Sequence, residues 1–233
     1  MKIYFLCISM QQYKEDFIKF LVKTGALKFG EFKLKSGRVG PYFLNIGQFS
    51  TGEAIAKLGY YYAQTLNEKI EDFDVVFGPA YKGIHLAVAT VIELTEKLGK
   101  NVSYAYNRKE IKDHGEGGML IGAPIDKNTK IVVVDDVITA GTALRLVIDV
   151  LKGVGSPKIE GVVLAVDRME KGQGDKSAIQ ELKDEFGINV FSIVNIEEII
   201  EYLYNREVDG VVYIDNKKMA KIKAYRQQYG VSS

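Results

Sequence analysis

The sequence has few of the residues that many enzyme classes depend on. Its 233 residues include one cysteine, Cys7, and two histidines, His85 and His114. A single cysteine excludes a disulfide framework and a cysteine-rich metal site, and two histidines cannot build a zinc centre. No grouping of serine, histidine and acid indicates a covalent nucleophile. The low cysteine content fits a reducing compartment, so we expect a cytoplasmic protein.

Net charge and long apolar runs are also missing. The 31 Lys and Arg residues nearly balance 30 Asp and Glu residues, which argues against a dedicated nucleic-acid-binding protein. The apolar run within residues 1–9 is too short to span a membrane, and no leader cleavage site follows it. We expect no membrane segment. We interpret residues 1–9 as an extension from an upstream start or a peripheral segment, and residues 10–233 as one domain.

The most informative stretch is Lys130–Leu151, KIVVVDDVITAGTALRLVIDVL. The run Ile131–Val134 predicts a strand buried on both faces, and this strand ends in Asp135 and Asp136. Small residues then lead into an apolar-periodic helix. The turn offers backbone N–H groups and hydroxyls to a phosphate, and the paired carboxylates suit ribose hydroxyls. A phosphorylated ribose therefore fits both halves, although simple capping of the helix by Asp or Thr is the alternative.

A second strand, turn and helix unit lies earlier in the chain. The strand Val75–Phe77 is followed by the turn GPAYKG and an apolar helix that continues through Leu98. The N–H groups of such a turn can contact phosphate oxygens, with Lys82 as a point charge. A turn without a ligand is the alternative. The alternation of strands and helices predicts an α/β fold with a parallel sheet.

A third unit places an arginine where a strand is expected to end. The strand Val162–Val166 leads into Asp167 and Arg168. The carboxyl ends of parallel strands meet at one edge of a sheet, so we expect Arg168 to lie on the same rim as Asp135. Its guanidinium can bind a ligand carboxylate through two hydrogen bonds. The alternative is a surface ion pair with Asp167 or Glu170.

The segment Asn107–Gly118, NRKEIKDHGEGG, is expected to be a loop. It has little apolar periodicity and ends in three glycines within four residues. Polar loops of this length inside a compact domain are commonly functional. We interpret it as a mobile flap that brings cations onto an anionic substrate and excludes water when closed. A solvated charged loop is the alternative.

Two further segments lie towards the ends of the chain. Residues 30–47 read as a hairpin, because apolar residues flank the turn SGRVGP. Lys35 stands beside this turn, where a solvated edge lysine is the alternative to a ligand-binding role. A last helix, expected over 217–229, looks peripheral.

The motif VVVDDVITAGTA resembles the phosphoribosyl-diphosphate-binding motif of type I phosphoribosyltransferases. The segments FGEFKLKSGRVGPYF, FGPAYKG and NRKEIKDHGEGG and the Asp167–Arg168 strand end resemble the orotate phosphoribosyltransferase family, in the family's order. Two departures stand out: Gly40 replaces a frequent serine, and Leu44 replaces a common second aromatic residue. The resemblance covers the chain from Met10 onward.

The resemblance implies a fold and a reaction. The fold is the type I phosphoribosyltransferase fold: α/β, with a central, mostly parallel sheet flanked by helices, a small N-terminal hood and a flexible catalytic loop. The reaction is the transfer of the phosphoribosyl group from 5-phosphoribosyl 1-diphosphate to orotate, giving orotidine 5′-monophosphate and diphosphate in pyrimidine biosynthesis. Mg²⁺ is required and is held mainly by substrate oxygens and water, with no direct protein ligand. The family also implies a homodimer in which the flap acts in the neighbouring subunit's site.

The resemblance also assigns roles to individual residues. The implied catalytic residues are Lys82, Lys112, His114, Asp135 and Asp136. The implied contacts of phosphoribosyl diphosphate are Lys35, Tyr81, Lys82, Arg108, Lys109, Lys112, His114, Asp135, Asp136, Val137, Ile138, Thr139, Ala140, Gly141, Thr142 and Ala143. The implied contacts of orotate are Phe43, Leu44, Thr139 and Arg168.

Two other functions are compatible with parts of the pattern. A phosphoribosyltransferase acting on a purine base would share the central motif, but Arg168 and the hairpin favour orotate. A non-catalytic regulator that senses phosphoribosyl diphosphate would need a nucleic-acid-binding segment, which the near-zero net charge does not support. An intact flap also favours turnover.

Overall fold

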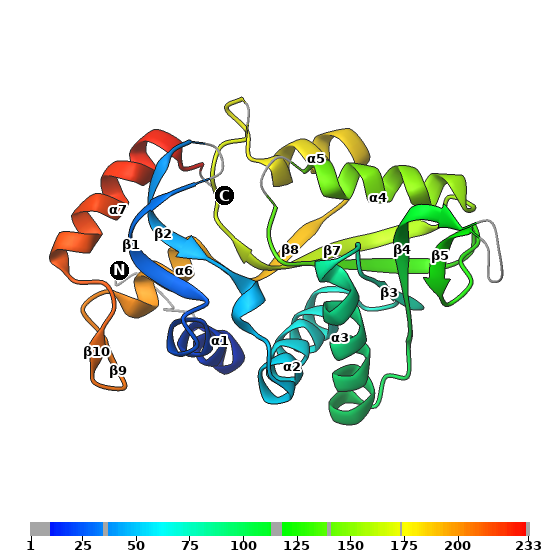
Figure 1. The fold of residues 1–233 in the computed structure, drawn as a ribbon, viewed down its shortest axis with the longest axis horizontal. Coiled ribbons are helices and arrows are strands. Elements are labelled where there is room, and N and C mark those ends of the chain that lie inside the picture. Colours follow the sequence, from blue (N-terminus) through cyan, green and yellow to red (C-terminus); the bar gives the residue numbers. More distant parts are fainter. Residues whose placement is uncertain (1–9, 35–36, 113–117, 139–140, 173, 232–233) are drawn as a thin grey trace, which may run out of the picture.

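The computed structural model describes residues 10–34, 37–112, 118–138, 141–172 and 174–231 (Figure 1). Its centre is a six-stranded sheet in the order β5-β4-β3-β6-β7-β8. These strands are β3 (Val75–Phe77), β4 (Ser103–Lys112), β5 (Gly118–Gly122), β6 (Lys130–Asp135), β7 (Lys158–Asp167) and β8 (Val190–Asn195). Neighbouring strands are parallel except at the β4–β5 edge, which is antiparallel. The expected mostly parallel α/β sheet is confirmed.

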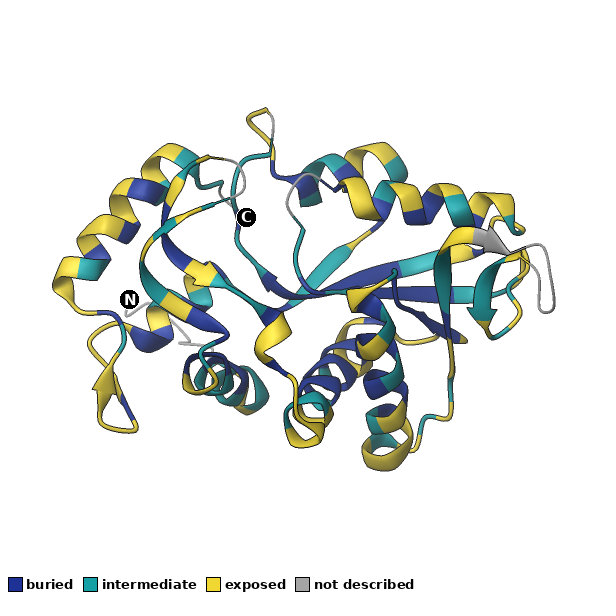
Figure 2. Cartoon of the chain, viewed as in Figure 1, coloured by how far each residue is buried: buried dark blue, intermediate teal, exposed yellow. Residues whose placement is uncertain are grey.

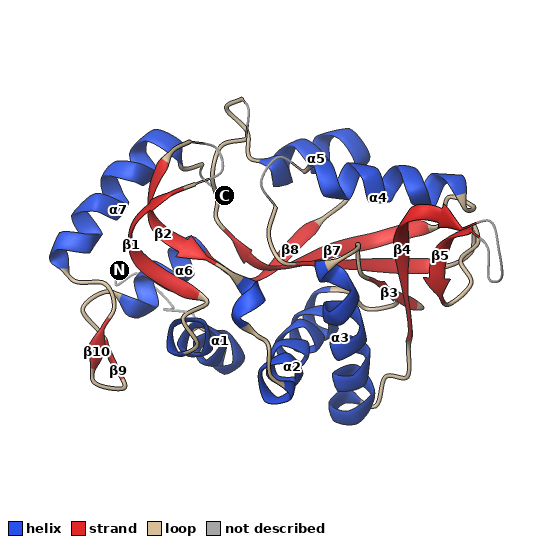
Figure 3. Cartoon of the chain, viewed as in Figure 1, coloured by secondary structure: helices blue, strands red, loops and turns tan. Residues whose placement is uncertain are grey.

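Helices cover both faces of this sheet (Figures 1 and 3). On one face lie α1 (Gln12–Lys23), α2 (Gly52–Lys69) and α3 (Lys82–Leu98), and on the other lie α4 (Thr142–Gly153) and α5 (Ala178–Phe186). Side chains of β6 alternate between the two cores: Val132 and Val134 join one cluster, while Ile131 and Val133 join the other. All four are fully buried (Figure 2), so the expected strand buried on both faces is confirmed.

The hood is built from both ends of the chain. Its hairpin pairs β1 (Leu27–Lys33) with β2 (Val39–Leu44). On the outer side of this hairpin lies α7 (Asn216–Tyr229), as Figure 1 shows. The remaining elements are the 3-10 helix Ile46–Gln48, α6 (Ile196–Leu203) and a small pairing of β9 (Glu207–Val208) with β10 (Val211–Val212). Although α7 lies at the periphery, as expected, it buries Met219, Ile222 and Tyr225.

The prediction of a loop over residues 107–118 is wrong for residues 107–112, which belong to β4, and for Gly118, which begins β5. The structure does not describe residues 113–117, and Gly118 lies opposite Lys112. Alternating polar side chains are compatible with an exposed edge pair, which explains why this strand has no apolar signal. In the described part of the chain, no helix combines the length and apolarity needed to cross a bilayer.

A close contact between α2 and α3 fixes the packing on one face of the sheet. A Cβ atom added at Gly59 of α2 would lie 2.6 Å from the backbone carbonyl carbon and oxygen of Ala89 in α3. Only a residue without a side chain permits this approach. The helices therefore meet with their backbones nearly in contact.

We expect Gly59→Ala to lower the free energy of unfolding by about 1–3 kcal/mol, because the added methyl group forces the two backbones apart. Chemical denaturation in urea measures this change. Gly52→Ala is the matched control, since an added Cβ at Gly52, in the first turn of the same helix, meets no atom within 4 Å. Equal stability of the two variants would contradict the close-packing argument.

Candidate active site

The acidic pair lies where β6 leaves the sheet. The Asp135 side chain accepts a hydrogen bond from the backbone N–H of Asp136 at 2.9 Å, and the Asp136 side chain accepts one from Val137 at 2.8 Å. The helix α4 then begins after Gly141, whose φ of +72° is a left-handed conformation that favours glycine. Five residues, 136–140, therefore separate the end of β6 from Gly141 at the start of α4.

A cavity of about 250 Å³ lies between this strand end and the start of α4. Its floor consists of Val133, Val162 and Leu164 from β6 and β7. Its other lining residues, all from the stretch that sequence analysis singled out, are Asp135, Val137, Ile138, Gly141, Thr142, Ala143 and Leu144. Backbone N–H groups in the first turn of a helix favour an anion, so the α4 end of this cavity suits a phosphate.

The electrostatics of the pair are set by burial. Burial is the main cause that raises the pKa of the Asp135 carboxyl, to about 6, and the neighbouring Asp136 charge raises it further. Asp136 is 8% exposed and forms an ion pair with Lys82, whose Nζ lies 2.6 Å from its carboxylate. Burial also lowers the pKa of His85, which lies one turn further along α3. The charge of Asp136 is therefore paired with a cation, whereas burial disfavours the charged form of Asp135.

The turn before Lys82 is tight and is fixed by contacts of its backbone. A Cβ added at Gly78 would lie 2.0 Å from the carbonyl oxygen of Gly83. The N–H of Ala80 donates a hydrogen bond to the Asn107 side chain at 3.0 Å. Asn107, at the base of the flap, was not singled out from the sequence, where it reads only as a polar residue. It connects the turn to β4.

The cations of the flap strand lie beside the same turn. Lys109 places its Nζ 4.4 Å from the centre of the Tyr81 ring, a cation–π contact. Arg108 precedes it in β4. Tyr81 itself is 67% exposed, so its ring and the lysine are accessible to a ligand. Tyr81, Lys82 and Lys109 therefore lie close to one another, and Lys82 connects them to Asp136.

A buried tyrosine of α2, Tyr62, binds the backbone of the acidic pair. Tyr62 of α2 is fully buried, and its hydroxyl donates a hydrogen bond of 2.7 Å to the backbone carbonyl of Asp135. On this side of β6 the neighbouring strand β3 has already ended, at the level of Val133. The hydroxyl thus replaces a strand donor. In the sequence Tyr62 is indistinguishable from any other apolar-face helix residue.

Arg168 follows β7, and its guanidinium is already paired. Its Nη2 lies 2.8 Å from both carboxylate oxygens of Glu170. Of the alternatives weighed from the sequence, the ion pair with Glu170 is present, whereas the Asp167 side chain accepts a hydrogen bond from the backbone of Met169. The guanidinium also lies 5.7 Å from the ring of Tyr42 in β2, next to Phe43.

Comparison with known proteins agrees with this geometry. The sequence profile of the phosphoribosyl transferase domain matches residues 45–205. Orotate phosphoribosyltransferase of Lachnoclostridium phytofermentans is 47% identical over 225 residues, which cover 96% of this chain and all of the relative. That of Saccharophagus degradans is 52% identical over 222 residues, covering 95% and 100%.

A solved structure extends the similarity to three dimensions. The crystal structure of orotate phosphoribosyltransferase from Francisella tularensis matches with a TM-score of 0.82 at 42% identity, covering 93% of this chain and all of the other. The chain belongs to the orotate phosphoribosyltransferase family. Its fold is accordingly the type I phosphoribosyltransferase fold expected from the sequence.

Several residues expected from the family motifs lie outside the described part of the chain. They are Lys35, Thr139, Ala140, His114 and the side chain of Lys112. Phe43 and Leu44 lie on β2, where the Phe43 ring, 40% exposed, stacks on Phe32 at 5.5 Å and Leu44 packs against the core. Tyr42, the residue before Phe43, contacts the Arg168 guanidinium, so this part of β2 lies close to Arg168.

The carboxylates at the end of β6 suit a hard cation such as Mg²⁺ that also binds oxygens of a substrate. Within the described residues, no group of three or more His, Cys, Asp or Glu side chains could hold a metal ion. Asp135 and Asp136 nevertheless offer carboxylate oxygens, which Mg²⁺ uses together with water and substrate phosphates. The family uses phosphoribosyl diphosphate and is generally dependent on Mg²⁺.

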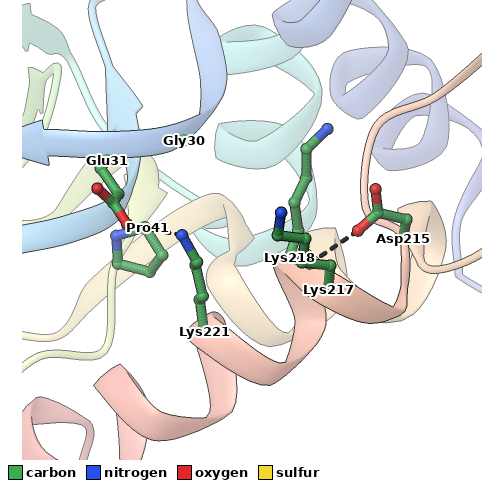
Figure 4. Close-up of a pocket in the computed structure, with 7 residues that line it drawn as sticks. All are labelled: Gly30, Glu31, Pro41, Asp215, Lys217, Lys218 and Lys221. Carbon is green, nitrogen blue, oxygen red and sulfur yellow. Dashed lines mark hydrogen bonds and ion pairs between the residues drawn. The ribbon is translucent and has the colours of Figure 1, made fainter.

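A second cavity, of about 240 Å³, lies between the hairpin and α7 and contains none of the expected site residues (Figure 4). Three lysines line it, but Lys221 pairs with Glu31 at 2.6 Å and Asp215 caps α7 through the N–H of Lys218. The Lys218 ammonium donates a hydrogen bond to the carbonyl of Tyr213 at 2.9 Å. Because its lining includes no residue expected to bind either substrate, we assign this cavity no role in the reaction.

We expect Asp135→Asn to stabilise the ligand-free protein by about 1–3 kcal/mol at pH 7, because the raised pKa means that the folded state bears the cost of the charge. Asparagine keeps the oxygen that accepts the Asp136 N–H. The gain should shrink as the pH falls from about 6, the folded pKa, towards the ordinary value of 3.8, since the wild-type carboxyl then protonates in the folded protein. Urea unfolding at pH 7.5 and pH 4 measures both values, and a gain independent of pH would refute the assignment.

Proposed function

We propose that this chain catalyses the Mg²⁺-dependent transfer of the phosphoribosyl group from 5-phosphoribosyl 1-diphosphate to orotate. The products are orotidine 5′-monophosphate and diphosphate, and the reaction belongs to pyrimidine biosynthesis. Identity of 43–52% to orotate phosphoribosyltransferases over nearly the whole chain supports this reaction. The observation that carries the proposal is the acidic pair at the end of β6, which opens directly into a cavity at the start of α4.

The two halves of this cavity match the two halves of the sugar phosphate. Asp135 and Asp136 accept hydrogen bonds from the ribose hydroxyls, which are donors that a carboxylate binds well. The 5-phosphate lies against the turn at residues 139–142 and against Ala143, where the α4 dipole and its N–H groups favour negative charge. Val137 and Ile138 form the wall between the two halves.

The diphosphate extends towards the cationic side of the rim. Lys82 and Tyr81 lie at the start of α3. Arg108 and Lys109, on the flap strand, would be supplied by the neighbouring subunit. Lys82 is 62% exposed along its side chain, so it can leave Asp136 and move to the diphosphate. Lys35, Lys112 and His114 complete this cationic set in the proposal. Bound Mg²⁺ supplies positive charge to the diphosphate oxygens.

The reaction then follows from the charges that develop. When the anomeric C–O bond stretches, positive charge grows on the ribose and negative charge grows on diphosphate. Asp135 and Asp136 stabilise the first, and the lysines stabilise the second. Orotate attacks through a ring nitrogen that gives up its proton easily, so the site needs positioned charges rather than a strong general base.

Orotate is bound at the junction of the hood and the sheet. Arg168 pairs with its carboxylate, the backbone at Phe43 and Leu44 meets the ring, and Thr139 contacts the ring from the phosphate turn. Ring recognition through the backbone accounts for Leu44 where an aromatic residue is common. Gly40 adjoins Leu34 closely, with a hypothetical Cβ 3.0 Å from its side chain, so a serine there would crowd the hairpin.

The proposal includes the setting of the enzyme. Residues 10–233 form one catalytic domain, to which residues 1–9 are an extension. The active form is a cytoplasmic homodimer in which the flap of one subunit enters the site of the other. It uses small-molecule substrates and binds neither nucleic acid nor membrane.

The direct test follows the loss of orotate absorbance with and without phosphoribosyl diphosphate and Mg²⁺. We expect turnover only with all three components. Adenine and hypoxanthine, tested in place of orotate, should give no nucleotide. Absence of orotate consumption by the folded protein, or preference for a purine, would overturn the proposal.

We expect Lys112→Ala to lower kcat about 10²-fold, the scale for removing one preorganised donor to a developing charge. The steady-state rate with saturating substrates measures this loss. Turnover within threefold of wild type would refute the role of Lys112 in stabilising the leaving diphosphate.

Mixed dimers test whether the flap is shared between subunits. Lys112→Ala and Asp136→Asn subunits, each nearly inactive alone, should regain about a quarter of wild-type activity after equal mixing and subunit exchange, since one site of each hybrid dimer would be intact. The measurement is the rate before and after exchange. No recovery, with hybrid formation verified by differential tagging, would show that each subunit uses its own flap.

A further inference from the structure

The surroundings of Arg168 form a bracket that the reaction chemistry does not by itself require. The bracket consists of Tyr42 from β2 and Glu170 from the segment after β7, with Tyr225 of α7 alongside. The side chains of Arg168 and Glu170 are 19% and 13% exposed. Because both charges are largely removed from water, this is not an ordinary surface ion pair.

Tyr42 holds the acid of this pair. Its side chain is 2% exposed, and its hydroxyl donates a hydrogen bond of 2.7 Å to Oε1 of Glu170. The same Oε1 accepts the hydrogen bond from Nη2 of Arg168 at 2.8 Å. One carboxylate oxygen is therefore fixed from two sides. Rotation of Glu170 away from the arginine would break both bonds.

The ring of Tyr42 restrains the arginine as well. The guanidinium lies 5.7 Å from the ring centre, within the range of a cation–π contact. Tyr42 thus contacts Arg168 directly through its ring and indirectly through Glu170. Phe43 follows Tyr42 on β2, and in the proposed function its backbone meets the orotate ring. The same strand therefore contributes to binding both the ring and the carboxylate of orotate.

Arg168 keeps unused hydrogen-bonding capacity in this bracket. Glu170 engages Nη2, and among the described residues the buried Nε has no hydrogen-bond partner. A guanidinium has five N–H donors, so the pairing with Glu170 leaves several of them unused. A ligand carboxylate bound at the exposed part of the guanidinium would supply acceptors for donors that Glu170 does not use.

We propose that Tyr42 and Glu170 are positioning residues that orient Arg168 so that its unused donors meet the carboxylate of orotate. This inference depends on the proposed function. It makes the hydroxyl of Tyr42 a determinant of base selection, because only a correctly oriented guanidinium distinguishes orotate from uracil, which lacks the carboxylate. A bracket that served only to join the hood to the sheet would affect stability without this selectivity.

The first test is Tyr42→Phe, which removes the hydroxyl and keeps the ring. We expect the KM for orotate to rise about five- to tenfold, the scale for leaving a buried hydrogen bond unmade. The kcat and the KM for phosphoribosyl diphosphate should stay within twofold of wild type. The ratio of kcat/KM for orotate to that for uracil should fall by a similar factor.

Tyr13→Phe is the matched control. The hydroxyl of Tyr13 donates a hydrogen bond of 2.8 Å to Oε2 of Glu68, a tyrosine–carboxylate bond between α1 and α2 that includes no residue of the bracket. The same chemical change at this position should therefore leave both KM values unchanged. Thermal denaturation of both variants reports any loss of folding.

Two substitutions at Glu170 test the same positioning role independently of Tyr42→Phe. Glu170→Ala should raise the KM for orotate at least as much as Tyr42→Phe. Glu170→Gln retains an oxygen that can accept from Tyr42 and Arg168, so it should recover most of this loss. If Tyr42→Phe does not fold, the comparison of the two Glu170 variants decides the question.

The possible results separate this inference from the proposed function. A wild-type protein that does not consume orotate overturns the proposed function. An active wild type with equal KM values for orotate in Tyr42→Phe and Tyr13→Phe overturns the positioning role alone. A parallel change in the KM of both substrates, or lower thermal stability with an unchanged ratio of orotate to uracil, also overturns it.

Discussion

Holding two carboxylates at the end of a strand buried on both faces is the constraint on which the rest of the site depends. Placing Asp135 and Asp136 there costs free energy, which the raised pKa of Asp135 reports. The cost is offset locally: backbone N–H groups bind both side chains, and Lys82 pairs with Asp136. The hydroxyl of Tyr62 holds the Asp135 carbonyl, so the peptide that carries the pair is fixed from the helix side as well.

The helices α2 and α3 carry the side chains that contact Asp135 and Asp136, so their packing positions these contacts. Lys82 pairs with Asp136 from the first residue of α3, directly after a turn in which Gly78 and Gly83 nearly touch. The helix α3 in turn meets α2 at Gly59 with backbone contact, and α2 carries Tyr62. These contacts connect Asp136, through Lys82, α3 and α2, to Tyr62 and the backbone carbonyl of Asp135.

The sequence predicts the parts of the fold that depend on local pattern. The apolar run of β6, the acids after it and the small residues before α4 are contiguous, so their geometry follows from strand and helix rules. The partners of Tyr62, Asn107 and Tyr42 could not be predicted, because each binds a residue 27 to 128 positions away. The helix α7 gives a weak apolar pattern among its lysines, so its contact with Tyr42 through Tyr225 was also invisible in the sequence.

Two cations of the rim are paired with acids before any substrate arrives, and they differ in how they can respond. Lys82 is 62% exposed and bonded to one carboxylate, so water can replace that partner and the lysine can move to a more strongly charged diphosphate. Arg168 is 19% exposed and held by both Glu170 and the ring of Tyr42. Breaking that buried pair would leave an uncompensated charge. In the proposed reaction, the sugar-phosphate side of the site would therefore bind by exchanging partners, whereas the base side would bind by adding a carboxylate to an arginine that stays in place.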